Sequence, residues 1–274
     1  MSIHPSVPDG VTANIEVVTP DQALEHIATT KINRPLSADT IDLYARDMAS
    51  GRWRFTGEPV KFDRDGHLSD GQHRMHAVFQ AETVLPFLIV RGLEPEAQEN
   101  MDTGRKRTVA NSLHLRGSDG KYATNVAALA SLVLEKQHPG QNYRPTPSEQ
   151  LALIDSDPHI RTIAIEIIHP LPKFPGLTKT WAGYCYWRLR QVDDSATAKF
   201  FDGLSTLENL GPGSPILALH KRLLNQPKGA GRDTRDQAIA LVFTAWNAWR
   251  RGDERARIQT PGLRQGVIAI PEPI

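Results

Sequence analysis

The sequence predicts an α+β protein, in which an N-terminal α/β domain precedes an all-helical C-terminal region. Strand-like and helix-like segments alternate between residues 15 and 92, which is typical of a compact α/β domain. After about residue 120 the apolar residues recur at helical spacing. The chain has 274 residues, of which 39% are hydrophobic and 23% charged, so it is long enough for one large or two modest domains.

Local start and stop signals justify the first elements. Residues 15–18 predict a short strand, and Thr19 followed by Pro20 predicts the start of a helix. Ser37 is the expected cap of a second helix, which Gly51 ends. The apolar face of that second helix follows helical spacing at Ile41, Tyr44, Ala45 and Met48.

The alternation continues to residue 90. The predicted elements are a strand over 60–63, a hairpin turn at Asp65-Gly66, a strand over 67–69, a helix from Asp70-Gly71 and a buried strand over 84–90. The expected apolar face of the helix consists of Met75, Val78 and Phe79. Pro86 favours an edge or an early position for the last strand.

The second half carries helical patterns throughout. Thr146-Pro147-Ser148-Glu149 is a capping box with proline at the first helical position. Further helices are predicted over 159–169, 180–190, 214–225 and 236–250. In the last of these, Trp246 and Trp249 share a stripe with Leu241 and Val242, which predicts a core position and not a platform for stacking nucleic-acid bases.

These patterns predict two domains with short tails. The first domain is expected over 15–118 and the helical domain over 120–256, with loose tails over 1–14 and 257–274.

The charge balance of 32 basic against 31 acidic residues excludes a polycation. The single cysteine excludes a disulfide framework and a cysteine-rich zinc site. No apolar run approaches the roughly 20 residues of a membrane helix, and MSIHPSVPDG is not a secretory signal, so we expect a cytoplasmic protein without a membrane partner.

The most informative segment is the turn Asp70-Gly71-Gln72-His73-Arg74, where a strand runs directly into a helix. The first N–H groups of a helix lack internal partners and lie at its positive end, so phosphate is a natural ligand there. Gly71 lets the backbone approach closely, Arg74 offers a charged fork and His73 offers a donor or a proton relay. The competing interpretation is an Asp70 helix cap with exposed His73 and Arg74 side chains.

This pentapeptide resembles the signature of DGQHR-type domains, which are members of the ParB/sulfiredoxin-like superfamily found in phage and mobile-element proteins. The resemblance covers roughly residues 15–116, and it includes the order of the elements on both sides of the turn. It implies a nucleotide pocket at the turn, with Glu99-Asn100-Met101-Asp102 at the place of an acidic-Asn motif that helps to hold phosphates or a metal ion.

Two departures narrow what the resemblance implies. Sulfiredoxin has its reactive cysteine in this turn, whereas this chain has Gln72, and its one cysteine is Cys185. Sulfiredoxin chemistry is therefore not expected. ParB proteins carry adjacent arginines where this chain has His73-Arg74, and they continue into a DNA-reading helix-turn-helix that we do not identify here.

A second group of cations follows Asp102. Arg105, Lys106, Arg107 and Thr108 come directly after Gly104, and we expect a second phosphate contact there, to a nucleotide or to a DNA backbone. Asp70 and Asp102 are the candidate ligands for a magnesium ion. His73 and His76 lie three residues apart, but without further ligands they do not predict zinc.

The sequence therefore predicts a nucleotide-binding enzyme of the ParB/sulfiredoxin-like class that hydrolyses a nucleoside triphosphate, or transfers its phosphoryl group, on or near DNA, with Mg²⁺ and without zinc or haem. The expected catalytic residues are Asp70, His73 and Arg74, and the expected phosphate-binding residues are Gly71, Gln72, Arg74, Asn100, Arg105, Lys106, Arg107 and Thr108. The alternatives are a DNA-binding partition or regulatory protein without turnover, a ParB-like nuclease and a DNA-base-modifying transferase. A homodimer is compatible with each of them.

Overall fold

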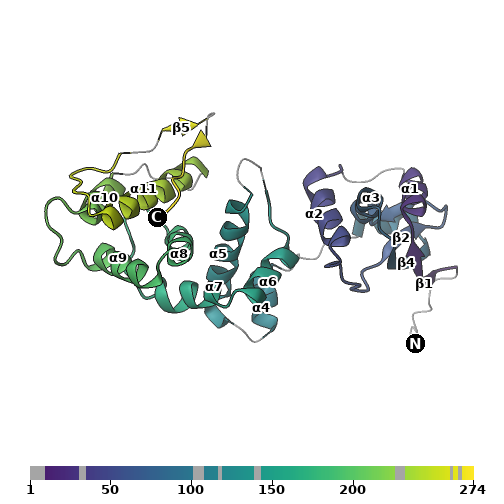
Figure 1. Ribbon diagram of the computed structural model, residues 1–274. Coiled ribbons are helices and arrows are strands. Elements are labelled where there is room, and N and C mark those ends of the chain that lie inside the picture. The colour runs from purple at the N-terminus through teal and green to yellow at the C-terminus, as the bar shows by residue number, and fades with distance from the viewer. Residues whose placement is uncertain are drawn as a thin grey trace. The chain divides into compact units, whose positions relative to one another are not determined.

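The computed structural model is an α+β protein that divides into two units, residues 1–106 and 107–274 (Figure 1). The structure describes residues 10–30, 35–100, 108–116, 119–138, 143–225, 232–259, 262–264 and 267–274. Within these ranges no helix is both long enough and apolar enough to cross a bilayer.

The first unit contains the predicted alternation of strands and helices. Its elements are β1 (Thr12–Val18), α1 (Pro20–Ala28), α2 (Ala38–Ala49), β2 (Val60–Asp63), β3 (Leu68–Asp70), α3 (Gln72–Ala81), β4 (Leu85–Leu93) and the 3₁₀ helix η1 (Pro95–Asn100). The strand β1 begins at Thr12, whereas the sequence predicts a loose segment up to residue 14. The predicted caps are confirmed, since the Thr19 hydroxyl accepts the Gln22 N–H and the Ser37 hydroxyl accepts the Thr40 N–H.

The four strands form one mixed sheet in the order β1-β4-β2-β3. The strand β1 pairs antiparallel with β4, and β3 pairs antiparallel with β2 across the predicted hairpin. The strands β2 and β4 are parallel, and the helix α3 lies between them in the chain. A parallel pair requires such a crossover connection, so the hairpin and α3 together place β4 beside β2.

The core of the first unit lies on one face of the sheet. Phe87 and Ile89 of β4 are buried together with Met75 and Val78 of α3, and α1 and α2 contribute to the same cluster. The residues of β4 between them point to the other face, as the twofold periodicity of a strand requires. Phe79 does not belong to this core, because its side chain is 45% exposed, so the predicted apolar face of α3 is wrong at that residue.

The second unit is mainly helical. Its elements are α4 (Val109–Leu115), η2 (Gly120–Tyr122), α5 (Ala123–Lys136), α6 (Pro147–Ser156), α7 (His159–Thr162), the π-helical η3 (Ile163–Ile167), α8 (Lys179–Arg190), α9 (Asp194–Thr206), α10 (Pro215–Leu224), α11 (Arg232–Arg251), β5 (Leu263–Arg264) and β6 (Val267–Ile268). The capping box at Thr146 is confirmed. The helix α9 and the small hairpin of β5 and β6 are not among the predicted elements.

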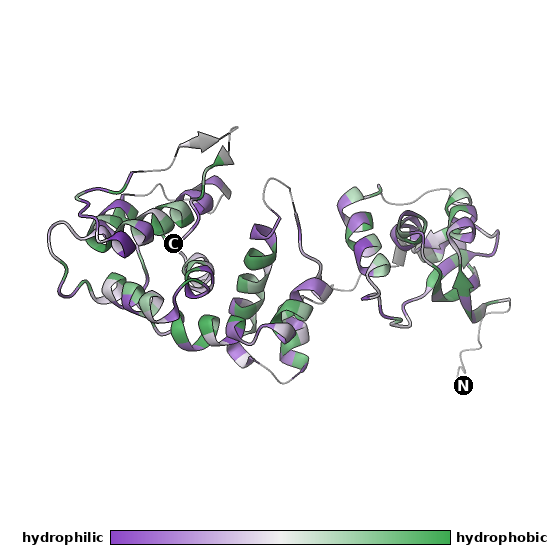
Figure 2. Ribbon diagram, viewed as in Figure 1, coloured by the Kyte–Doolittle hydropathy of each residue, from purple (hydrophilic) through white to green (hydrophobic). Residues whose placement is uncertain are grey.

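Aromatic side chains fill the centre of the second unit. Trp246 is fully buried, and its ring centroid lies 5.5 Å from that of Phe200 in α9 and 5.7 Å from that of Trp249. Figure 2 shows apolar and polar residues alternating around the helices, as amphipathic packing requires. The core position predicted for the tryptophan stripe is thus confirmed for Trp246, and Trp249 packs against that core while partly exposed.

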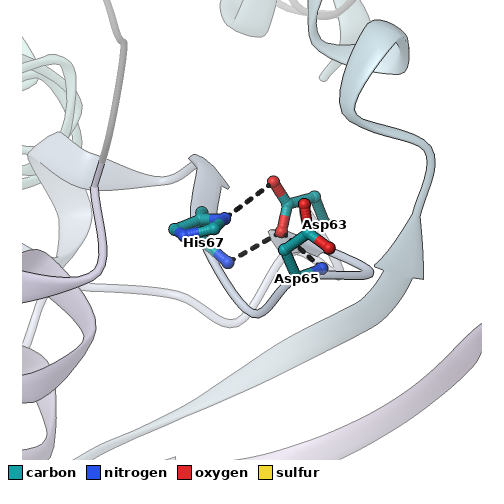
Figure 3. Close-up of side chains that lie close together, drawn as sticks. All are labelled: Asp63, Asp65 and His67. Carbon is teal, nitrogen blue, oxygen red and sulfur yellow. Dashed lines mark hydrogen bonds and ion pairs between the residues drawn. The ribbon is translucent and has the colours of Figure 1, made fainter.

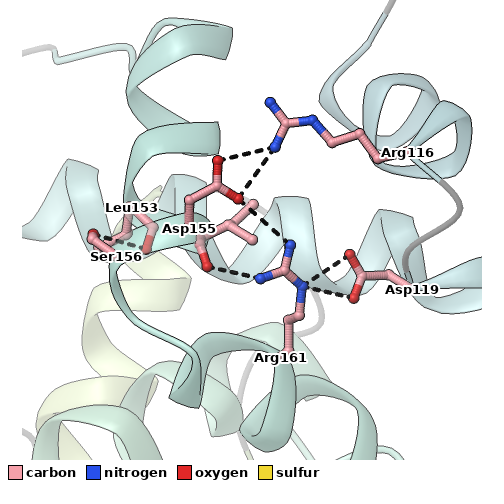
Figure 4. A network of polar contacts seen from close by, with 7 residues as sticks. Arg116, Asp119, Leu153, Asp155, Ser156 and Arg161 are labelled. Atoms are coloured by element: carbon pink, nitrogen blue, oxygen red, sulfur yellow. Dashed lines mark hydrogen bonds and ion pairs between the residues drawn. The ribbon is translucent and has the colours of Figure 1, made fainter.

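A polar network ties α4, α6 and α7 together (Figure 4). The Arg161 Nε lies 3.0 Å from an Asp119 carboxylate oxygen, and its Nη1 donates to the Ile154 carbonyl at 2.9 Å. Arg116, which directly follows α4, donates from its Nη1 to the Asp155 carboxylate of α6 at 3.0 Å. Asp119 has a left-handed backbone conformation, with φ = 64°, and its almost fully buried side chain forms an ion pair with Arg161.

The unit boundary and the C-terminal end differ from the predicted domain limits. The helix α4, which the sequence places in a domain ending at 118, packs into the core of the second unit through Leu113. The C-terminal end packs on α11 where a loose tail is expected: Trp246 Nε1 donates to the Ile274 carbonyl at 2.8 Å, and Asn247 bonds the backbone of Glu272 and Ile274. These contacts join residues 25 to 28 positions apart, which helix periodicity does not report.

Candidate functional site

The candidate site is the turn at which β3 runs into α3. Gly71 occupies the N-cap position with φ = 104°, and a Cβ atom added there would lie 3.0 Å from Val60 Cγ1. Both the backbone angle and the approach of β2 therefore require glycine. Gly71 has no side chain with which to cap the start of the ten-residue α3. The first N–H groups of a helix have no partner within the helix and lie at its positive end, where an anion is favoured.

Arg74 is largely buried, and it points its fork at protein carbonyls. Its Nη1 donates to the Glu58 carbonyl at 2.7 Å, and its Nη2 donates to the Pro59 carbonyl at 2.8 Å. Its side chain is 12% exposed. The guanidinium therefore fastens the segment before β2 to the first turn of α3. Its positive charge remains beside the turn, but the fork itself is occupied within the protein.

Asp70 lies between two cations. One of its carboxylate oxygens is 3.2 Å from Lys61 Nζ and 3.7 Å from Arg74 Nη2. Lys61 and Asp70 are direct cross-strand partners, which explains why the shorter of the two contacts forms. Two positive charges against one negative charge leave this end of α3 with a positive excess, which favours an anion and opposes a metal ion bound by Asp70.

His73 contacts α2 through its ring. Its Nε2 accepts the backbone N–H of Ser37 at 3.1 Å, and Ser37 is the cap of α2. An accepting Nε2 carries no proton, so the proton of the neutral imidazole is on Nδ1. The imidazole thus joins the beginnings of two helices. One helical turn further on, partial burial lowers the pKa of His76.

The structure also describes the side chains of two other predicted site residues, Gln72 and Thr108. Gln72 is buried at the start of α3. The Thr108 hydroxyl accepts the Asn111 N–H at 3.2 Å and caps α4 in the second unit. Outside the described residues or side chains lie Asn100, Asp102, Arg105, Lys106 and Arg107.

One further polar group lies in the hairpin between β2 and β3 (Figure 3). Asp63, Asp65 and His67 each offer a ligand atom, and within the described ranges these atoms lie within 4.8 Å of one another. Asp63 Oδ1 accepts the backbone N–H groups of Asp65 at 2.9 Å and of His67 at 2.8 Å, and Oδ2 lies 3.2 Å from His67 Nδ1. The sequence indicates the turn at Asp65, but only the spacing of Asp63 and His67 across it could have indicated this group.

The contacts in the hairpin lower the pKa of Asp63. Burial acts to raise the pKa of Asp63, but the hydrogen bonds from His67 and Asp65 and the charge of the His67 ring outweigh it. The pKa of Asp63 therefore lies below its ordinary value, and the carboxylate is ionised at neutral pH. These contacts account for the group as the organiser of a tight turn.

The turn at Gly71 thus brings together Lys61, Asp70, His73 and Arg74 from β2, β3 and α3. The positive charge at the turn comes from Lys61 and Arg74, while the side chains of His73 and Arg74 hold neighbouring segments in place. Comparisons of this chain with protein-family models, with curated proteins and with solved structures give no match.

Proposed function

We propose that the first unit binds the phosphate groups of a nucleotide at the turn between β3 and α3. The observation that carries this proposal is Gly71, whose positive φ and close contact with Val60 require a residue without a side chain directly before the first N–H groups of α3. An anion at this position gains hydrogen bonds from these groups and a favourable interaction with the helix dipole. The protein would then act as a nucleotide-dependent enzyme of the ParB/sulfiredoxin-like class, on or near DNA.

The charges around the turn support phosphate as the ligand. Lys61 and Arg74 outnumber Asp70, and both cations lie within 4 Å of its carboxylate. The Arg74 charge is held in place by two carbonyl groups, so it stabilises added negative charge with little reorganisation. In phosphoryl chemistry such fixed positive charge and accurate positioning supply most of the catalysis.

The proposed roles of the remaining residues follow from their contacts. His73 can donate or relay a proton only through Nδ1, because Nε2 accepts the Ser37 N–H. The surroundings of Asp70 do not fit a magnesium site, since Lys61 and Arg74 already neutralise its charge. The proposal therefore depends on phosphate contact with backbone N–H groups and cations, and not on a metal ion held by Asp70.

Isothermal titration with ATP, CTP, GTP and ADP, with and without Mg²⁺, tests the proposal. We expect binding of at least one nucleotide. Asp70→Asn removes a negative charge beside the phosphate and should tighten binding by about fivefold, which is the effect of one charge at about 4 Å in watery surroundings. Lys61→Ala should weaken binding by a similar factor. Arg64→Ala removes an exposed ion pair with Glu94 away from the turn and serves as the control, with unchanged affinity.

Two results would contradict the proposal. If none of the four nucleotides binds, the turn has no nucleotide site, and steeply salt-dependent retention of DNA would then favour the alternative of a DNA-binding protein without turnover. If Asp70→Asn abolishes a binding that depends on Mg²⁺, Asp70 is a metal ligand and the arrangement given above is wrong.

A further inference from the structure

The face of the sheet opposite the helices carries a continuous set of apolar side chains on β1 and β4. Three cross-strand pairs form this apolar sheet face: Ala13 with Val90, Ile15 with Leu88, and Val17 with Pro86. Ile15 is 66% exposed and Val17 is 61% exposed. A single exposed apolar residue is ordinary, but a contiguous set of this size on a sheet usually marks an interaction surface.

The backbone at this place is also open to a partner. Among the described residues, β1 is an edge strand with β4 on one side. It is seven residues long and pairs with β4 without a bulge, whereas β3 at the opposite edge has only three residues. Proteins usually protect an edge with lysine, proline, a bulge or a short strand.

The sequence of β1 lacks these protective features. It contains neither lysine nor proline, and its one charged residue, Glu16, points to the helix-covered face. There Glu16 forms a two-pronged ion pair with Arg91, and Arg91 lies 5.0 Å over the Phe62 ring. The charge that could repel a neighbouring strand is thus neutralised within the unit. A long, regular and apolar edge remains.

We propose that this edge pairs with the β1 strand of a second copy of the chain, antiparallel and around a twofold axis near Ile15. In that register Ile15 meets Ile15, Ala13 meets Val17, and Asn14 meets Glu16. Every apolar residue of the exposed face then has an apolar partner, and no like charges meet. The two apolar sheet faces join into one across the axis.

The self-complementarity of β1 is what selects a second copy as the partner. An open strand edge requires an extended strand as its neighbour, because only a strand satisfies its row of N–H and C=O groups. The partner strand must also place apolar residues on the same face at alternate positions. The strand β1 meets both requirements by itself, and a twofold axis gives each copy the same contacts.

Analytical ultracentrifugation of the full chain over a range of concentrations tests the pairing. We expect a reversible dimer, and we expect Ile15→Lys to weaken the dimer at least tenfold. Val17→Lys is a second variant with the same expectation, and the high exposure of both side chains lets the monomer keep its fold, which circular dichroism checks. The matched control is Leu115→Lys, an equally exposed residue of α4 in the second unit, which should dimerise like the unmodified chain.

A cysteine at the proposed axis tests the register. The chain has one cysteine, Cys185, which is fully buried, so Ile15→Cys introduces the only exposed thiol. Directly opposed residues of antiparallel strands have Cβ atoms about 4.5–5.5 Å apart, and a small shift of the strands brings them within the roughly 3.5–4.5 Å that a disulfide spans, so mild oxidation should give a covalent dimer. Leu115→Cys should give none at the same concentration. A chain that is monomeric at all concentrations, a dimer that survives Ile15→Lys, or equal cross-linking by both cysteine variants would overturn the proposal.

Discussion

The two units of the molecule differ in how completely they bury their central elements. In the first unit helices cover one face of the sheet, while Ile15 and Val17 on the other face stay exposed. In the second unit α8 is buried over six consecutive residues, 181–186, and α11 is buried over 238–243. A helix that is buried on all sides serves as a scaffold. The central sheet of the first unit therefore keeps an exposed apolar face, whereas these two helices of the second unit are buried along six consecutive residues.

The polar groups follow the same division. In the second unit buried charges neutralise one another: Arg235 binds Glu135 and Asp236, and Asp236 also binds Lys136. Burial lowers the pKa of Lys136, while the contact with Asp236 opposes the shift. In the first unit the contacts among Lys61, Asp70 and Arg74 leave a positive excess near Gly71, and the N-cap residue of α3 is a glycine. The proposed phosphate site therefore lies where the charges of the first unit are not fully neutralised.

The largest expected effect comes from breaking the buried centre of the second unit. Trp246→Ala removes a fully buried ring that contacts Phe200 and Trp249, and we expect a loss of about 3–5 kcal/mol in the free energy of unfolding. Denaturation by guanidinium chloride, followed by circular dichroism, measures it. Phe55→Ala in the first unit is the control, because that ring is 48% exposed and should cost less than about 1 kcal/mol. Equal losses would contradict the comparison of the two units.

A smaller effect is expected at the turn of the first unit. Gly71→Ala places a side chain on a residue with left-handed backbone and against Val60. We expect it to lower the free energy of unfolding by about 1–3 kcal/mol. The control is Gly66→Ala, which has φ = 84° but no atom within 4 Å of the added Cβ, so it bears only the backbone cost of about 1 kcal/mol. Hydrogen exchange read by mass spectrometry should rise in peptides of the first unit alone. If both substitutions lower the free energy of unfolding by the same amount, the close approach of Val60 to Gly71 does not add to the destabilisation.

The smallest expected effect is a change in the stability of the fold at low pH, which depends on Asp63 in the hairpin. The pKa of Asp63 is lowered from its ordinary value of 3.8 in the folded state, so its ionised form stabilises the fold above about pH 3.8, and that contribution is lost as pH falls through the folded pKa. Asp63→Asn should therefore be less stable than the unmodified chain at neutral pH, and the difference should shrink below about pH 3.8. Urea denaturation at several pH values measures this difference. Asp65→Asn, the control, keeps the Asp63 contacts, and a pH dependence of the same size in that variant would contradict the assignment.

Much of the fold could be predicted because its signals are local. Thr19, Ser37 and Thr146 each cap the helix that the sequence predicts there, since a cap involves only residues within three positions. The helix α9 was missed because Thr197 lies on its buried face and Gly203 inside it, which weakens the apolar pattern. The candidate turn was found because a strand, a glycine and a helix start follow one another directly.

The roles of the residues around that turn could not be predicted in the same way. The carbonyls that Arg74 binds belong to residues 15 and 16 positions earlier, and the N–H that His73 accepts lies 36 positions earlier. The sequence therefore indicated the charged Arg74 guanidinium but not the carbonyl groups that it binds. Likewise, it gave no sign that α4 belongs to the second unit or that the C-terminal end packs on α11.

The sequence by itself determined the caps that begin α1, α2 and α6, the glycine turn at Gly71 before a helix, and the helical character of the second half. Only the tertiary structure decided the strand order β1-β4-β2-β3, the exposed apolar sheet face and the partners of Asp70, His73 and Arg74. The physical reason is the range of the interactions. Caps and periodicity act over a few residues, whereas burial, strand pairing and ion pairs depend on segments that are far apart in the chain.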